Sequence, residues 1–149
     1  MEIKKAIPSD AQKLSDLTLK SKSYWKYSAD QLEKWKSDLT ITAEYISSSE
    51  VYKLMEGNQL MAYYAYFSLD KKRVKLDNMF IHPDYIGKGL GKLLLDDLFN
   101  RARIQGFAKV ELDADPHAEE FYKKMNFRVV GKVESSVKNR FLPIMEKDI

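Results

Sequence analysis

The chain has 149 residues, of which 44% are hydrophobic and 32% charged, and it contains no cysteine. This composition predicts one globular domain over residues 1–149 and excludes a disordered chain, disulfides and thiolate chemistry. The net charge of +3 suits an anionic ligand, but the lysines are dispersed and do not form the dense basic stripe that is typical of nucleic-acid-binding proteins. We therefore expect no nucleic-acid partner.

The first half of the chain predicts one strand and three helices. They are expected at residues 2–7, from about residue 10, from about residue 29, and at residues 43–48. Ser9 with Gln12 and Ser28 with Gln31 have the spacing of capping boxes, in which two side chains satisfy the first free amides of a helix. An aromatic connection joins the first two helices.

The second half of the chain predicts a sheet with a βαβ unit. Three antiparallel strands joined by tight turns are expected at residues 51–55, 59–67 and 74–81. A glycine-rich loop, a helix to about Gln105 with Gly106 as its stop, and a strand at 109–112 follow. A helix at 116–125 and strands at 127–133 and about 140–146 complete an α+β layout with a mixed sheet.

The glycine-rich loop at residues 82–92 lies between a strand and an amphipathic helix. Glycines let the backbone approach a ligand, and the free N–H groups at a helix start favour phosphate. A Walker A loop is excluded because Ile86 and Leu93 stand where glycine and serine or threonine are required. The dinucleotide fingerprint is excluded because Lys92 occupies the position of its third glycine.

The segment at residues 81–95 closely resembles the acetyl-CoA-binding motif of the GCN5-related N-acetyltransferase (GNAT) superfamily, commonly Gln/Arg-x-x-Gly-x-Gly/Ala. Ile86 occupies the first position, and Gly89 and Gly91 match the other two. Because the Ile86 side chain offers no hydrogen bond, the resemblance implies that pyrophosphate is held chiefly by the backbone.

A second motif, residues 115–127, resembles the Asn-x-x-Ala-x-x-Phe-Tyr-x-x-x-Gly-Phe segment of the same family. Asp115 replaces the asparagine, and Asn126 replaces the glycine. Asparagine tolerates the left-handed backbone that ends a helix, so the second replacement is mild. Together the two motifs imply a GNAT fold, with a mostly antiparallel sheet of six to seven strands flanked by helices.

The resemblance implies an N-acetyltransferase that moves the acetyl group of acetyl-CoA to a primary amine of a small molecule or peptide. Attack would be direct, in a ternary complex. The residues it assigns to acetyl-CoA lie on the strand before the loop, in the loop and in the second motif. They are Met79, Phe80, Ile81, Ile86, Gly87, Lys88, Gly89, Leu90, Gly91, Lys92, Asp115, Ala118 and Tyr122.

Two residues are the candidate catalytic groups. The resemblance assigns Tyr122 as the general acid toward the sulfur, and with an ordinary pKa of about 10 a tyrosine is protonated at neutral pH. Asp77 lies where many relatives place a base, with Glu111 and Asp113 as alternatives. His82 has a suitable intrinsic pKa for a base, but its place before Pro83 favours a capping role.

Four residues are candidates for the acceptor site. Tyr24, Trp25 and Tyr27 lie in the aromatic connection that in relatives often covers the acceptor, where apolar or cation–π contact could hold an amine. Packing of a helical connection explains them equally well. Arg140 could reach an acceptor carboxylate.

The remaining expectations concern partners and location. His82 and His117 lack the spacing of a metal pair, so we expect no metal. Residues 1–5 lack the apolar stretch of a signal peptide, and the most apolar run, residues 60–69, is too short to span a bilayer. We expect a cytoplasmic monomer or homodimer that does not associate with membranes. A catalytically silent CoA-binding regulatory or sensor module is the alternative to an enzyme.

Overall fold

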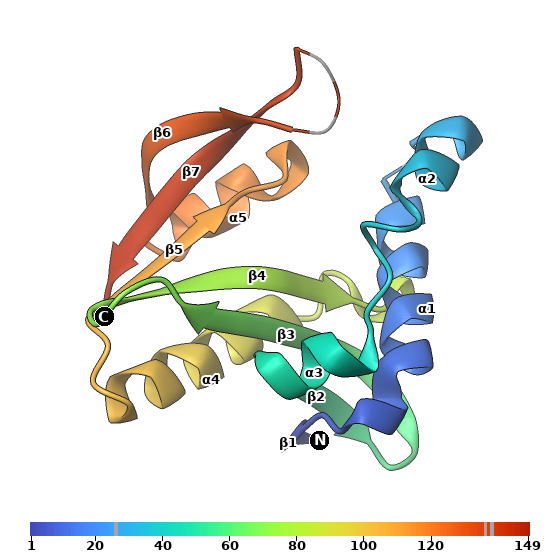
Figure 1. The fold of residues 1–149 in the computed structure, drawn as a ribbon, viewed down its shortest axis with the longest axis horizontal. Helices are drawn as coiled ribbons and strands as arrows, with labels where there is room; N and C mark the ends of the chain where they lie inside the picture. Colours follow the sequence, from blue (N-terminus) through green and yellow to red (C-terminus); the bar gives the residue numbers. More distant parts are fainter. Residues whose placement is uncertain (26, 136, 138) are drawn as a thin grey trace. The chain divides into compact units, whose positions relative to one another are not determined.

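The computed structural model of the protein describes residues 1–25, 27–135, 137 and 139–149 (Figure 1). Its strands are β1 (Glu2–Lys5), β2 (Glu50–Glu56), β3 (Gln59–Ser68), β4 (Arg73–Ile81), β5 (Lys109–Asp113), β6 (Arg128–Glu134) and β7 (Phe141–Asp148). Its α-helices are α1 (Ala11–Ser23), α2 (Ala29–Trp35), α3 (Ala43–Ser48), α4 (Leu90–Ile104) and α5 (Glu119–Lys124). Short 3-10 helices are η1 (Pro8–Asp10), η2 (Pro83–Tyr85) and η3 (Pro116–Ala118).

The seven strands form one mixed sheet in the order β1-β2-β3-β4-β5-β7-β6. β1 with β2, β2 with β3, β5 with β7, and β6 with β7 pair antiparallel. β4 and β5 pair in parallel, and α4 makes the crossover between them. The predicted α+β fold with a βαβ unit in a mostly antiparallel, seven-stranded sheet is confirmed.

The chain divides into two compact units. Unit 1 comprises residues 1–66 and 78–94, and unit 2 comprises residues 67–77 and 95–149. β3, β4 and α4 therefore each contribute residues to both units. The expectation of one domain stays a prediction.

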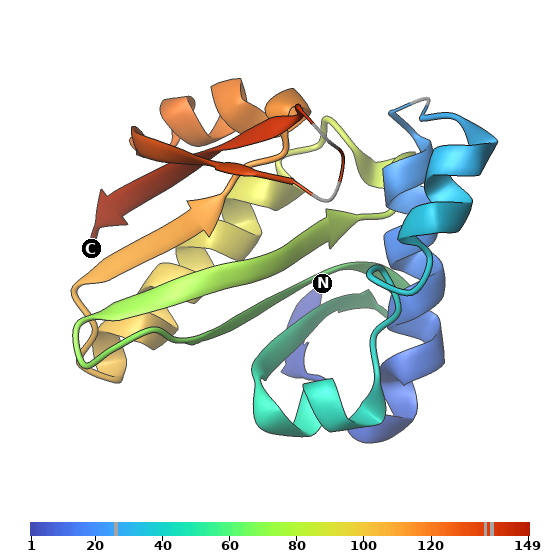
Figure 2. The same ribbon diagram turned by 45° about the horizontal axis from the view of Figure 1, so that its top comes forward.

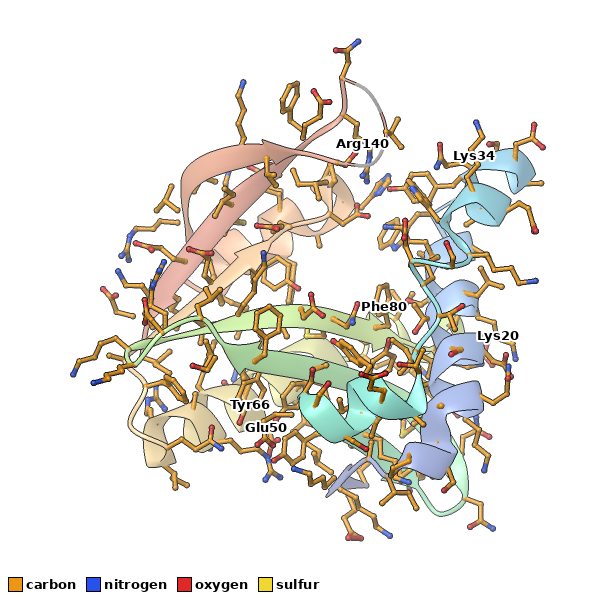
Figure 3. All side chains as sticks on the ribbon, viewed as in Figure 1. Lys20, Lys34, Glu50, Tyr66, Phe80 and Arg140 are labelled. Carbon is orange, nitrogen blue, oxygen red and sulfur yellow. The ribbon has the colours of Figure 1, made fainter. Side chains whose placement is uncertain are left out.

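The core of unit 1 lies between α1, α3 and one face of its strands. α1 and α2 lie side by side (Figures 1 and 2). Leu14, Leu17 and Tyr63 are fully or almost fully buried in this core, and Phe80 of β4, which is labelled in Figure 3, packs against it. Leu14 and Leu17, three positions apart, form the apolar face of α1. On the second face, Tyr52, Tyr64 and Tyr66 form a stacked series of buried rings.

Unit 2 encloses its own aromatic core. Figure 2 shows β5, β7 and β6 side by side with α5 above them. Phe127 lies 5.5 Å from Tyr122 and 6.1 Å from Phe99 between ring centroids. Val110, Leu112 and Met145 of neighbouring strands are fully buried. The turn that ends α5 has Asn126 at φ 70°, as the sequence predicts for this position.

One of the two predicted capping boxes is wrong. Ser9 does not cap α1, because residues 8–10 form η1 and the Asp10 carboxylate accepts a 2.9 Å hydrogen bond from the Ile7 amide. The proline at the first position of η1 favours this tighter turn. The second helix begins as expected, since the Ser28 hydroxyl accepts a hydrogen bond from the Gln31 amide.

No helix in the described part of the chain combines the length and apolarity that a membrane crossing requires. No group of three histidine, cysteine or carboxylate side chains among the described residues has the arrangement of a metal site.

Candidate functional site

The glycine loop of unit 1 has the backbone that its sequence predicts. Gly87 and Gly89 have φ of 83° and 81°, and a Cβ at either position would meet nothing within 4 Å. The glycines are therefore required by their backbone conformation, not by close packing. α4 begins at Leu90, so the amides of its first turn have no partner within the helix.

The charge around this loop favours an anion. The first turn of α4 contains no acidic residue, so nothing there opposes the positive end of the helix dipole. Lys88 and Lys92 are exposed beside it. The Lys88 amine also lies 5.9 Å from the centroid of the Tyr85 ring. Ile86 is half-buried and offers an apolar side chain, as expected.

His82 caps η2 and is not positioned as a free base. Its Nδ1 accepts a hydrogen bond of 3.1 Å from the Asp84 amide, and its own amide donates to the Met61 carbonyl at 2.8 Å. The capping role expected from the sequence is confirmed.

The end of β4 leads directly into the loop. The parallel register with β5 covers Arg73 to Lys75 opposite Lys109 to Glu111, and it does not extend to residues 79–81. Met79, Phe80 and Ile81 are half-buried. Backbone groups along a strand can pair with a ligand that carries amide groups.

Asn78, just before residues 79–81, makes a polar contact that the sequence does not predict. The Asn78 side-chain amide donates to the Tyr45 hydroxyl at 2.8 Å, which ties β4 to α3. The two residues are 33 positions apart, and only the tertiary fold brings them together.

The aromatic connection between α1 and α2 contains two different pairs. Tyr24 and Trp25 are 48% and 39% exposed and meet edge to face, with centroids 5.0 Å apart. Tyr27 instead packs edge to face on the buried Trp35 at 4.7 Å. The Lys22 amine lies 5.2 Å from the Tyr27 ring and 5.0 Å from the Trp35 ring. The Lys22 ammonium therefore already makes the cation–π contact with the Tyr27 and Trp35 rings. Tyr24 and Trp25, in contrast, present exposed rings.

Asp115 of unit 2 contacts both His117 and Arg140. It caps η3, accepting a 2.9 Å hydrogen bond from the His117 amide and lying 3.0 Å from His117 Nδ1. Its other oxygen accepts from Arg140 at 3.4 Å, just before β7 (Figure 3). The structure thus joins two separately predicted site residues, Asp115 and Arg140. A carboxylate can fill the capping role of the family's asparagine because both side chains accept a backbone N–H.

Tyr122 is buried in the same unit, with 7% of its surface exposed. Burial raises its pKa well above the ordinary value, and the negative charge of Asp115 adds to this rise. Both effects disfavour the phenolate. Tyr122 therefore carries its phenol proton at neutral pH.

The two alternative bases, Glu111 and Asp113, each form an ion pair. Glu111 pairs with Arg73 at 3.2 Å, and Asp113 pairs with Lys75 at 2.8 Å. Asp77 is exposed on β4.

The candidates fall into two groups. Unit 1 contains the glycine loop, residues 79–81 and the aromatic connection, and unit 2 contains Asp77, Asp115, Ala118, Tyr122 and Arg140.

A profile of the acetyltransferase (GNAT) domain family matches residues 24–148. The chain therefore belongs to the GNAT acetyltransferase family, as the two motifs predict.

Curated relatives match parts of the chain. An uncharacterized N-acetyltransferase of Gracilaria tenuistipitata var. liui is 27% identical over 62% of this chain and 50% of its own length. The glucosamine 6-phosphate N-acetyltransferase of Trypanosoma brucei brucei is 40% identical over 36% of each chain. A peptidyl-lysine N-acetyltransferase of Salmonella typhimurium is 37% identical over 40% of this chain and 39% of its own. The matches thus span half or less of each relative.

Solved structures share the fold along the whole chain. The PaiA N-acetyltransferase of Thermoplasma acidophilum in complex with coenzyme A superimposes with a TM-score of 0.83 and 20% identity, covering 99% of this chain and 98% of its own. A GCN5-related N-acetyltransferase of Rhodopseudomonas palustris gives 0.84 and 22%, covering 99% and 95%. A GNAT family acetyltransferase of Elizabethkingia anophelis with acetyl-CoA bound gives 0.67 and 15%, covering 99% and 97%.

Proposed function

We propose that the protein transfers the acetyl group of acetyl-CoA to a primary amine of a small molecule or peptide, by direct attack in a ternary complex. The observation that carries the proposal is the loop with positive φ at Gly87 and Gly89, which opens α4. Two relatives are named for glucosamine 6-phosphate and for peptidyl-lysine. Both acceptors present a primary amine.

The backbone of the glycine loop is proposed to bind the pyrophosphate of the donor. Amides at residues 87–92 would donate to its oxygens, and Lys88 and Lys92 would add positive charge. The backbone of residues 79–81 would pair with the amide-bearing arm of the donor and offer an N–H to the carbonyl oxygen as negative charge develops on it. The family resemblance also assigns Asp115, the cap of η3, and Ala118 to the donor.

Two side chains are proposed to transfer protons, one as general acid and one as general base. Acetyl-CoA supplies an activated thioester. A C–N bond forms as the C–S bond breaks, so the departing sulfur needs a proton and the attacking amine must lose one. Tyr122 would donate to the sulfur, because its phenol is protonated at neutral pH, although the burial that raises its pKa also makes it a weaker acid than an ordinary tyrosine. Asp77 would take the amine proton directly or through water.

The exposed aromatic pair is proposed to contact the acceptor. Tyr24 and Trp25 are partly exposed, whereas Tyr27 would act indirectly by anchoring the connection through Trp35 and Lys22. Arg140 would face the acceptor only if it exchanged its contact with Asp115 for a substrate carboxylate.

The cellular setting is part of the same proposal. We infer a cytoplasmic enzyme, because acetyl-CoA and amine metabolites meet there and the sequence suits a reducing compartment. Acetyl-CoA and an amine are its proposed partners, and neither nucleic acid nor a membrane is needed for the reaction.

Release of CoA thiol from acetyl-CoA tests this function against a silent CoA-binding sensor. The protein is incubated with acetyl-CoA and polyamines, amino acids or aminoglycosides, and acetyl-CoA binding is measured separately by calorimetry. At least one amine should raise thiol release above hydrolysis. Binding without acceleration by any amine would favour the sensor, and absence of binding would contradict both functions.

A further inference from the structure

Strand β6 forms an exposed edge of the sheet. β6 ends the strand order, and every residue of the strand is exposed. Val133 is 38% exposed, and Phe141, which lies opposite Glu134 on β7, is 44% exposed. An uncovered edge strand with exposed apolar side chains is a template for pairing with another strand.

The hydrogen bonds of the neighbouring strand show which backbone groups of β6 face outward. The Ser135 amide donates to the Arg140 carbonyl, so residue 135 faces β7. Because successive backbone groups of a strand point to opposite sides, those of Glu134 face away from β7, and those of Lys132 do likewise.

The contacts of Pro143 independently support this assignment. Lys132 lies opposite Pro143, which has no N–H, and the Pro143 carbonyl accepts from the Ala114 amide instead of facing β6. Lys132 and Pro143 are therefore a pair without mutual hydrogen bonds. The N–H and C=O groups of Lys132 and Glu134 are thus directed to the edge.

This arrangement is self-complementary. If two copies pair antiparallel about a twofold axis at Val133, Lys132 of each copy lies opposite Glu134 of the other. Each Lys132–Glu134 pair can then exchange two backbone hydrogen bonds, and its side chains carry opposite charges. The two Val133 side chains meet at the axis.

We propose that β6 is a homodimer interface, in which residues 131–135 of two copies pair antiparallel about Val133. The irregularity in the β6–β7 register between Val129 and Gly131 limits the pairing at one end. β6 ends at Glu134, which limits the pairing at the other end. The side chains suit a second copy, because Lys132 lies 4.8 Å from the Phe141 ring and remains exposed, and no ion pair of Glu134 occurs among the described residues.

Charge reversal tests the register. Sedimentation velocity over a concentration series should show a monomer–dimer equilibrium for the wild type. Glu134→Lys places like charges opposite each other at both symmetric pairs and should weaken association by about tenfold or more. The double variant Lys132→Glu with Glu134→Lys should restore it. Glu33→Lys, the same charge change on exposed α2, is the matched control and should leave association unchanged.

Hydrogen exchange provides a second readout. The amides of Lys132 and Glu134 should become protected as concentration rises, whereas those of β1, the opposite edge strand, should not. A wild type that stays monomeric throughout, or a dimer that Glu134→Lys leaves unaffected, would overturn the proposal. Neither result would bear on acetyl transfer.

Discussion

Replacing Gly89 with alanine tests whether acetyl-CoA binding requires the backbone conformation of the glycine loop. At φ 81°, Gly89 lies outside the left-handed region that residues with a Cβ usually occupy, although the added methyl group would meet open space. The expected penalty is therefore backbone strain, roughly 1–2 kcal/mol, without a steric clash. If the loop must keep this conformation to bind the donor, acetyl-CoA affinity should fall by about five- to thirtyfold.

Gly57→Ala is the matched control for this substitution. Gly57 has φ 58° in the turn between β2 and β3, and a Cβ there would also meet nothing within 4 Å. Both variants should lose stability in thermal unfolding, Gly57→Ala no more than Gly89→Ala because φ 58° lies within the left-handed region, but only Gly89→Ala should weaken acetyl-CoA binding in titration calorimetry. Asparagine at position 89 should recover part of the affinity, because it tolerates left-handed backbone better than alanine. Equal acetyl-CoA affinity in the wild type and Gly89→Ala would refute the loop assignment.

Three further predictions address single contacts. Asp10→Asn should lower stability by about 1–3 kcal/mol, because Asp10 pairs with Lys53 at 2.8 Å with both side chains mostly buried. Although burial raises the pKa of Asp10, its bonds to the Ile7 amide and Lys53 lower it overall. This contribution should thus be present above about pH 4 and vanish as pH falls through the lowered pKa, a difference that urea unfolding at neutral and acidic pH can measure. Lys22→Met should lower the free energy of unfolding by roughly 0.5–1 kcal/mol and change tryptophan fluorescence, because it removes the cation from the Tyr27 and Trp35 rings. Unchanged fluorescence would contradict this contact. Tyr122→Phe should lower kcat by about 100-fold with acetyl-CoA affinity retained, and full activity would exclude the general acid.

The sequence predicts the path of the chain well where local patterns are strong. Alternating apolar residues and tight turns place β2 and β3 within two residues of their ends, and helix α3 begins and ends as expected. These signals are local, so tertiary contacts are not needed to read them. The capping residue of the first helix is missed because Pro8 starts η1 and Asp10, not Ser9, then satisfies a free amide.

The site is predictable as far as its motifs reach. Gly87 and Gly89 have the positive φ that their residue type suggests, and Asn126 ends α5 as the family's glycine would. The surroundings of Asp115 are not predictable, because Arg140 lies 25 residues away and meets it only in the folded chain. Local sequence likewise gives no sign that Lys22 fills the space beside Tyr27.

Transfer of a labelled acetyl group to an amine tests the central claim most directly. The protein is incubated with isotopically labelled acetyl-CoA and either glucosamine 6-phosphate or a lysine-containing peptide, the two acceptor types that the names of its relatives suggest, together with a wider panel of primary amines. Mass spectrometry should find the label on the nitrogen of at least one amine, in an amount that depends on the protein and falls with Tyr122→Phe. Acetyl-CoA that binds while every amine stays unlabelled would contradict the proposed acetyltransferase activity.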